Sequence, residues 1–374
     1  MKVPSQGPRR SPPRRASRGA IRAACGAVLA LGVGCARTRY GAVAERIRQG
    51  AVPGGIVESV PCVRQARYQC GPAALAMVLG AWGETPDAAA IADAVFRDER
   101  RATLTGAMAA YPDPARYWVL AGPGDVREIS RKVAAGMAVI ALLQPGRPLV
   151  RAGHYYVVHG TDEQARLFLL RSGTRCEEVM AWDLFDYRWA PAGRWRMVVC
   201  PPDRASWRLA PEERLSRGLH FERQGEIDLA EADYVAGLAE APGLAQLYIN
   251  LSNLWMAGQR WDAAASLLEN GLTATVRDRR LVNSLAWVRG EQGRFSEAEG
   301  LAREAVGPDP ETARVEYLDT LGWVLFRAGA RAEACQWLGL ARRRAEEIGA
   351  GAAVRDWLAE HWTAACAPES IADP

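Results

Sequence analysis

The arrangement of apolar and polar residues changes once along the 374-residue chain, close to Pro201. Before it, one helical block (73–79) precedes several runs of β-branched and aromatic residues, which predict strands. After it, apolar residues recur at helical spacing among Ala, Leu, Glu and Arg. Helices followed by an antiparallel sheet indicate an α+β domain, and residues 58–201 are enough for one core. The predicted strands lie near 137–143, 154–159, 165–171 and 195–200.

The first region contains three further predicted helices. One opens at Thr85-Pro86-Asp87, with Thr85 as N-cap and Pro86 in the first turn. The others cover Gly124 to Ala134 and Ala181 to Arg188. The loop 144–152 lies just before a predicted strand, and it either borders a substrate groove or simply connects two strands.

A repeat organises the second region. Four glycines recur at intervals of 33, 35 and 36 residues, each followed five residues later by an alanine. Glycine suits a tight turn between two helices, and small residues let paired helices approach closely. The pattern resembles the tetratricopeptide repeat (TPR), which implies an all-α solenoid over 211–367 with a capping helix, after a linker at 202–210. The repeated residues are Gly225, Gly258, Gly293 and Gly329, with Ala230, Ala263, Ala298 and Ala334.

The strongest chemical signal in the first region is Cys70. Pro72 and the helix-forming run after it place Cys70 at or just before a helix N-terminus. The unpaired amides and the helix dipole at that position are expected to lower the thiol pKa and favour the nucleophilic thiolate. Gln65, five residues earlier, can donate its side-chain amide to a developing oxyanion, beside the N–H of Cys70.

Two of the four histidines are candidate partners of Cys70. His154 and His159 lie in one predicted strand, and because their positions differ by an odd number they point to opposite faces. At most one of them faces Cys70. A surface or hydrogen-bonded core position is the more common role for a lone strand histidine, and we expect it for His159.

The run Gln65-x4-Cys70-Gly-Pro-Ala-Ala-Leu-Ala, then His154-Tyr-Tyr-Val-Val, then the strand 167–170 resembles the bacteriocin-processing, double-glycine leader peptidase family. The resemblance covers residues 58–201 and implies a papain-like cysteine peptidase domain. It also implies that Cys70 is the nucleophile, His154 the general base and Gln65 the oxyanion donor.

One position departs from the family pattern. Where the family has Asp-Pro after the strand that follows the histidine, this chain has Ser172-Gly173. Ser172 is therefore the candidate third member, although a hydroxyl brings no negative charge to an imidazole. Asp162, Asp183 and Asp186 are alternatives that a neighbouring loop or helix can supply.

The N-terminus has the features of an export signal. Residues 1–34 hold seven basic residues and no acidic one, and a short apolar run from Ala23 to Gly34 follows, too short to span a bilayer. Val33-Gly34-Cys35 resembles a bacterial lipobox, which implies a lipid anchor on Cys35, a tether at 35–57 and a location in the cell envelope facing the periplasm. The alternative is ordinary cleavage and a soluble periplasmic protein. Without 1–34 the net charge falls from +4 to −3, so nucleic acid is not an expected partner.

Six cysteines remain when Cys25 and Cys35 are set aside. No pair has zinc-ligand spacing, and we expect no metal or cofactor. An oxidising exterior permits disulfides, and Cys176–Cys200 and Cys335–Cys366 are possible pairs, with free buried cysteines equally possible. The chain has no P-loop signature, so ATP is not expected either.

Two functions of different classes follow. The first is an exported, lipid-anchored cysteine peptidase whose repeats recruit a substrate or protein partner. The second is a scaffold lipoprotein in which the peptidase-like domain is inactive or holds a peptide. Acyl or amide transfer through the same thioester is a third possibility.

Overall fold

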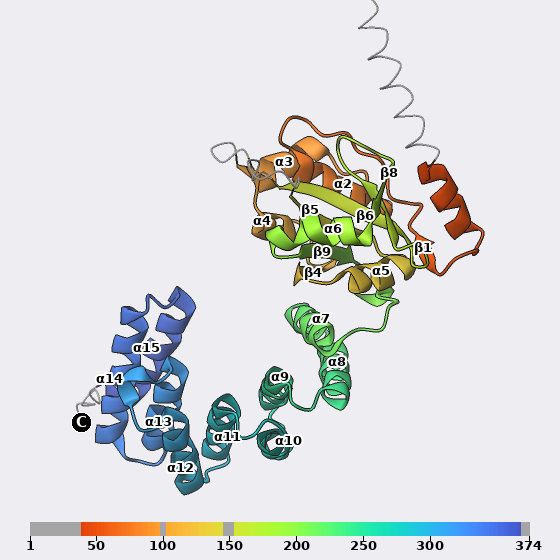
Figure 1. Ribbon diagram of the computed structural model, residues 1–374. Helices are drawn as coiled ribbons and strands as arrows, with labels where there is room; N and C mark the ends of the chain where they lie inside the picture. Colours follow the sequence, from red (N-terminus) through yellow and green to blue (C-terminus); the bar gives the residue numbers. More distant parts are fainter. Residues whose placement is uncertain (1–38, 98–101, 145–152, 368–374) are drawn as a thin grey trace, which may run out of the picture. The chain divides into compact units, whose positions relative to one another are not determined.

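The computed structural model describes residues 39–97, 102–144 and 153–367 (Figure 1). They form two compact units that divide between Trp207 and Arg208. We call them the sheet unit (39–207) and the helical unit (208–367) and describe each by itself. The export signal, Cys35 and the loop 145–152 lie outside the described residues. No described helix has both the length and the apolar content needed to cross a bilayer.

The sheet unit is built on one antiparallel sheet in the order β4-β9-β5-β6-β7-β8, with β1 paired to β6. A separate two-stranded sheet pairs β2 with β3. Neighbouring strands are thus often far apart in sequence, which brings distant segments of the chain together. The strands are β1 (Gly54–Ile56), β2 (Phe96–Arg97), β3 (Ala102–Thr103), β4 (Trp118–Pro123), β5 (Val139–Leu143), β6 (His154–Asp162), β7 (Leu167–Arg171), β8 (Glu178–Ala181) and β9 (Trp195–Cys200).

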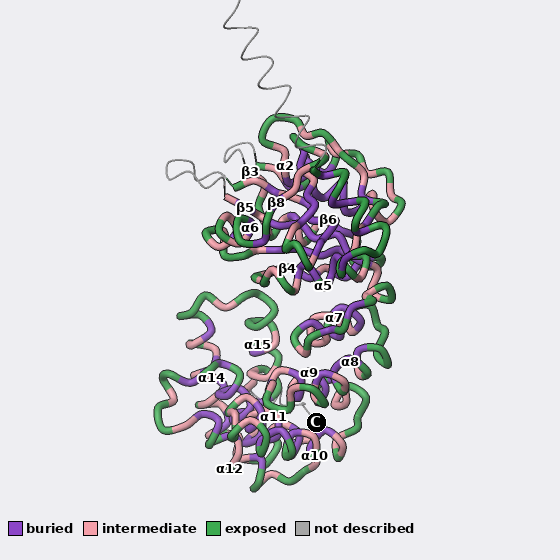
Figure 2. Tube along the Cα trace, turned by 45° about the vertical axis from the view of Figure 1, so that its right-hand side comes forward, coloured by how far each residue is buried: buried purple, intermediate pink, exposed green. Residues whose placement is uncertain are grey.

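Helix α2 (Cys70–Ala81) packs on one face of this sheet, where it contributes an uninterrupted buried run from Gly71 to Leu79. Tyr155 and Val157 of β6 share its core, in which buried residues gather (Figure 2). Elsewhere in the sheet unit, Phe185 of α6 (Trp182–Trp189) packs against Phe168 of β7, with ring centroids 5.0 Å apart. Because the core of α2 is shared with β6, the first residue of the helix is held where that strand begins.

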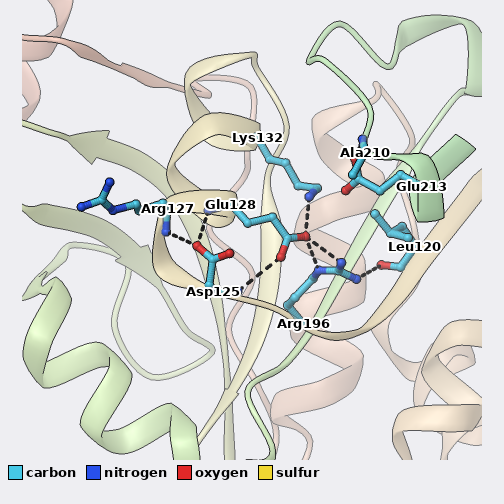
Figure 3. A network of polar contacts seen from close by, with 8 residues as sticks. All are labelled: Leu120, Asp125, Arg127, Glu128, Lys132, Arg196, Ala210 and Glu213. Carbon is cyan, nitrogen blue, oxygen red and sulfur yellow. Dashed lines mark hydrogen bonds and ion pairs between the residues drawn. The ribbon is translucent and has the colours of Figure 1, made fainter. Parts of the chain in front are cut away.

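The remaining helices of the sheet unit are α3 (Ala88–Val95), α4 (Thr105–Ala110) and α5 (Val126–Ala134). The prediction of Thr85 as the cap of α3 is wrong, because the helix starts later and Asp87 caps it by accepting a hydrogen bond from the Ala89 N–H. At α5, Asp125 and Glu128 form a capping box. Glu128 also holds the buried Lys132 and Arg196 of β9 in ion pairs (Figure 3).

Residues 39–57 do not form the expected tether. Residues 39–48 are helical, and Tyr40, Val43 and Ile47 are buried against Leu169 of β7. The β1 strand then adds to the sheet at β6. The apolar face of this segment is hard to find in the sequence because glycines and polar residues surround it.

The helical unit consists, in its described residues, of four antiparallel helix pairs and a final helix. The final helix packs on the last pair, as expected for a solenoid with a cap. The pairs are α7 (Pro211–Arg223) with α8 (Ile227–Glu240), α9 (Ala245–Ala257) with α10 (Trp261–Ala274), α11 (Arg279–Glu291) with α12 (Phe295–Val306), and α13 (Val315–Arg327) with α14 (Arg331–Glu347), before α15 (Ala352–Cys366). A short 3-10 helix occurs at 310–312, and two others lie in the sheet unit at 190–192 and 202–204.

The repeat register is corrected by one residue in the second pair. Gly225, Gly293 and Gly329 adopt positive φ in the turns within pairs, but the second turn places its positive φ at Gln259, not at Gly258. The buried alanine that follows is accordingly Ala264, while the predicted Ala263 is only partly buried. With this correction the turn residues recur at 34, 34 and 36 residues.

Candidate active site

Cys70 is the first residue of α2, as predicted, and its thiol is free and half-buried. Backbone N–H groups of Cys70, Gly71 and Tyr155 lie close enough to stabilise its sulfur as a thiolate. Gly71 allows this close packing, because an added Cβ would lie 2.6 Å from the Thr103 side chain. Cys70 is thus placed at the start of β6, beside the residue that follows His154.

The turn before α2 is strained. The Gln69 N–H donates to the Ala66 oxygen at 3.2 Å, and Tyr68 within this turn has a φ of 66°. Tyrosine rarely adopts this conformation, which glycine accepts freely. Such strain is often stored at functional sites, and here the turn reverses the chain between Gln65 and Cys70.

The expected low thiol pKa is wrong for the free protein. Burial raises the pKa of Cys70, and this effect outweighs the three backbone N–H groups that lower it. Burial also lowers the pKa of His154. Both groups are therefore neutral at pH 7, which leaves the imidazole able to accept a proton from the thiol.

His154 opens β6, and its ring packs edge-on against Tyr156, with centroids 5.0 Å apart. Tyr155, between them, points into the α2 core, and its hydroxyl donates to the Thr103 oxygen. Among the described residues no hydrogen bond joins His154 to the Cys70 sulfur. Catalytic hydrogen bonds are often formed only when substrate is bound.

His159 has the core role that we expected for it. It is fully buried, and the Tyr40 hydroxyl lies 3.0 Å from its Nε2. Burial lowers the pKa of His159 to about 4, so the ring is neutral in the folded protein. A bulge between Val158 and Gly160 interrupts the alternation of β6 at this residue.

Gln65 lies against Gly173, which is more than 100 residues away in the sequence. Its N–H donates to the Gly173 oxygen at 3.1 Å. The Oε1 atom of its amide is buried without a hydrogen-bond partner among the described residues. The NH₂ group of the same amide is a hydrogen-bond donor, which is what an oxyanion needs.

Ser172 directly follows β7, as predicted, but its hydroxyl is engaged within its own turn. It lies 3.1 Å from the Thr174 Oγ1 and accepts from the Arg175 N–H at 3.1 Å. No hydrogen bond from Ser172 to His154 occurs among the described residues. Its role as third member stays a prediction.

The three alternative acids are bound elsewhere. Asp162 pairs with Arg46 at the far end of β6, Asp183 pairs with Arg166, and Asp186 pairs with Arg194. Sequence reasoning missed one further acid, Glu178, which pairs with Leu170 in the β7–β8 register. Burial raises the pKa of Tyr156, and the negative charge of Glu178 raises it further. Burial raises the pKa of Glu178 itself.

The disulfides differ in part from the possibilities considered. Cys335 pairs with Cys366, as one of them proposed. Cys176 pairs with Cys62 rather than Cys200, because the turn after β7 meets the segment before α2, while Cys200 lies buried at the end of β9 outside either disulfide. No group of three or more potential metal ligands occurs among the described residues.

Comparison with known proteins confirms the predicted resemblance. Residues 57–193 match the model of the Peptidase_C39 like family, and this range includes Gln65, Cys70, His154 and Ser172. No curated protein matches the chain. The chain thus has a C39-like, papain-like domain followed by TPR-like helices.

Solved structures with similarity to parts of the chain include peptidase domains and TPR proteins. The peptidase domain of Streptococcus ComA, a bi-functional ABC transporter, is 17% identical, covering 38% of this chain and 98% of that chain with a TM-score of 0.32. A Bacillus anthracis protein described as a C39-like peptidase is 17% identical, covering 39% and 96% with a TM-score of 0.34. A TPR protein of Thermus thermophilus is 18% identical, covering 46% and 92% with a TM-score of 0.37.

Proposed function

We propose that this protein is an exported, lipid-anchored cysteine peptidase whose repeats recruit a substrate or a protein partner. The observation that carries the proposal is the placement of the free Cys70 thiol among three backbone N–H groups where α2 begins. The family match over the same residues supports it. Cys70 acts as nucleophile, His154 as general base and Gln65 as oxyanion donor.

The mechanism starts from two neutral groups. As the Cys70 sulfur attacks the peptide carbonyl carbon, the thiol proton passes to His154, and the carbonyl oxygen becomes an oxyanion. The Cys70 N–H and the Gln65 amide stabilise that oxyanion. The imidazolium returns its proton to the leaving amine, and water then hydrolyses the thioester with His154 again acting as base.

No carboxylate is hydrogen-bonded to His154 among the described residues, which predicts slow turnover. In a triad the acid orients the histidine and stabilises its charged form. Glu178, whose pKa is raised by burial, has no hydrogen bond to His154 among the described residues either. With an activated ester, whose leaving group departs readily, acylation is faster than hydrolysis of the thioester, so the acyl intermediate accumulates and is the best observable.

The test uses p-nitrophenyl acetate as a substrate-independent acylating probe. Intact-mass and peptide-mass spectrometry of the full chain should find one acetyl group on Cys70, formed with release of p-nitrophenol. Cys70→Ser should remove this adduct, whereas Cys200→Ser, which changes the buried cysteine of β9 that is in neither disulfide, should retain it. An unacylated Cys70 in the folded wild-type protein contradicts the peptidase proposal.

A scaffold without catalysis is the second candidate, and a specific observation favours it. His154 packs on Tyr156 and has no hydrogen bond to the thiol among the described residues. A scaffold predicts identical envelope peptidomes from strains with Cys70 and with Cys70→Ser. Peptides that lose a terminus only with Cys70 support hydrolysis, and peptides joined to a new amine support acyl transfer.

The anchor is tested separately. Replacing Cys35 by Ala should release the protein from the membrane fraction to the soluble periplasmic fraction and abolish labelling by radioactive palmitate. Unchanged fractionation and labelling contradict a lipid on Cys35, and the soluble periplasmic alternative is supported if the wild-type protein carries no label. The repeats' partner role predicts that a binding protein is lost when 208–374 are deleted.

A further inference from the structure

The turn 172–176, where the family carries its acid, is tied to the segment 62–65 from the other end of the domain. Cys62 and Cys176 form a disulfide that joins residues 114 positions apart. The Arg64 Nη1 donates to the Thr174 oxygen at 2.9 Å, and Arg171 donates to the Val60 oxygen. With the Gln65 to Gly173 hydrogen bond, four links hold residues 60–65 against residues 171–176.

Gly173 makes this approach possible. A Cβ at Gly173 would lie 2.3 Å from the Gln65 Cβ and 2.4 Å from its Oε1, so the Gln65 side chain would have to move. The φ of Gly173 is not in the region reserved for glycine. Glycine is therefore required at 173 because the Gln65 side chain occupies the space, and not because of the backbone conformation.

The turn is itself closed by hydrogen bonds. The Ser172 N–H donates to the Arg175 oxygen at 2.6 Å, and the Arg175 N–H donates back to the Ser172 hydroxyl. Ser172 and Gly173 are buried. Ser172 thus stabilises the surface on which Gln65 rests, in the position where the family places an acid.

We infer that the turn 172–176 is the element that positions Gln65 as oxyanion donor, with Gly173 as its contact surface and the Cys62–Cys176 disulfide as its fastening. The inference rests on the proposed function. It makes oxyanion stabilisation depend on a disulfide, which forms only where thiols are oxidised. Gly173 and the disulfide act through Gln65 and touch no reacting atom, so they are positioning elements.

Two reactions of Cys70 separate positioning from general damage. Acetylation by p-nitrophenyl acetate passes through an oxyanion, whereas alkylation by iodoacetamide needs only the thiolate. Gly173→Ala should lower the second-order rate of acetylation by about 10²-fold, the range found for the loss of one oxyanion donor. The alkylation rate should stay within about two-fold. The control is Gly106→Ala, because a Cβ at Gly106 meets nothing within 4 Å.

Gln65 must mediate the effect. Gln65→Ala should lower acetylation as much as Gly173→Ala does, and the double variant should be no slower than either single one. Additive losses, or a Gly173→Ala variant that acetylates like wild type, overturn the inference and leave the peptidase proposal intact. Equal losses in acetylation and alkylation also overturn it. A wild-type protein that is not acetylated at all overturns both.

The role of the Cys62–Cys176 disulfide in positioning Gln65 is tested by removing each of the two disulfides in turn. Cys62→Ser/Cys176→Ser should lower acetylation at least ten-fold, with folding confirmed by circular dichroism and alkylation as the reference. Cys335→Ser/Cys366→Ser, which removes the helical unit's disulfide, should leave the acetylation rate unchanged. If both double variants acetylate like wild type, the disulfide does not position Gln65. Gly173→Ala keeps the test decisive if the first double variant does not fold.

Discussion

The sheet unit is held together by contacts between segments that are distant in sequence, whereas the helical unit is held together by contacts between consecutive helices. In the sheet unit, β1 pairs with β6 and β4 pairs with β9, so partners lie between 72 and 108 residues apart. In the helical unit, each helix packs mainly on the one before and the one after it. The candidate chemistry lies in the first kind of unit, because long-range pairing can bring distant residues such as Cys70 and His154 to one end of a sheet.

The disulfides show the same contrast. Cys62–Cys176 spans 114 residues and connects the segment before Cys70 to the turn after β7, whereas Cys335–Cys366 spans 31 residues and fastens α14 to α15. In the helical unit, where neighbouring helices are also neighbours in sequence, the disulfide fastens only the final helix. In the sheet unit, the disulfide joins two segments that are distant in sequence and lie beside the candidate site.

The sharpest test of this contrast compares one histidine in each unit. His154→Ala should lower the acetylation of Cys70 by about 10²- to 10⁴-fold, the usual contribution of a general base. His361→Ala in α15 removes the hydrogen bond to the buried Asp319, 2.8 Å away, and should leave acetylation within about two-fold. It should instead destabilise the helical unit by about 1 to 3 kcal/mol, since a buried carboxylate loses its partner.

Rates of p-nitrophenol release and urea unfolding followed by tryptophan fluorescence measure the two effects. Acetylation that survives His154→Ala contradicts its role as base. Acetylation that falls with His361→Ala contradicts the assignment of chemistry to the sheet unit alone.

The second prediction concerns stability without the disulfides. In the chain-entropy model, closing a loop of 114 residues stabilises the fold by about 4.8 kcal/mol and a loop of 31 residues by about 3.7 kcal/mol. Cys62→Ser/Cys176→Ser should therefore lower the free energy of unfolding of its unit more than Cys335→Ser/Cys366→Ser does. Chemical denaturation of each double variant measures this, and the reverse order would show that the local staple is the more important one.

The third prediction uses two glycines of the helical unit. A Cβ at Gly322 in α13 would lie 2.6 Å from Leu338 in α14, whereas one at Gly300 in α12 meets nothing within 4 Å. Gly322→Ala should destabilise by about 1 to 2 kcal/mol through overpacking. Gly300→Ala should stabilise by up to about 1 kcal/mol through helix propensity. Melting temperatures that move in the same direction for both variants contradict the tight α13–α14 contact.

The helices and turns of the helical unit could be predicted from its sequence almost completely, because each helix packs on helices that are close to it in sequence. Small residues seven positions before a turn, such as Gly218 and Gly322, mark tight helix contacts. The one error, at Gly258, arose because a glycine pattern cannot reveal a turn in which another residue type adopts positive φ. In the second turn that residue is Gln259, which has a φ of 56°.

In the sheet unit, the sequence motifs identified the candidate site residues, but the contacts between distant segments could not be predicted. Cys70, Gln65 and His154 could be named from local motifs, but the packing of Gln65 on Gly173 depends on chain segments more than 100 residues apart. The thiol pKa was mispredicted for the same reason: the helix N-terminus is a local feature, whereas the burial that outweighs it is produced by the whole fold.

The last prediction concerns the acid sensitivity of the sheet unit through His159, which appears only when the pH is lowered. Its pKa of about 4 in the fold lies below the ordinary 6.5, so the unfolded chain binds a proton before the folded one as the pH falls. The stability that neutral His159 contributes is fully present above pH 6.5 and decreases by about 2 to 3 kcal/mol by pH 4.5. Asp319 in the helical unit acts in the opposite sense, because burial raises its pKa and protonation then favours the folded state.

The urea midpoint of the sheet unit should therefore fall as the pH is lowered from 7 to 4.5. His159→Gln should reduce this dependence of the midpoint on pH, since glutamine can still bond to Tyr40 but does not titrate. A slope that His159→Gln leaves unchanged assigns the acid sensitivity to another group and removes His159 from the contrast between the two units.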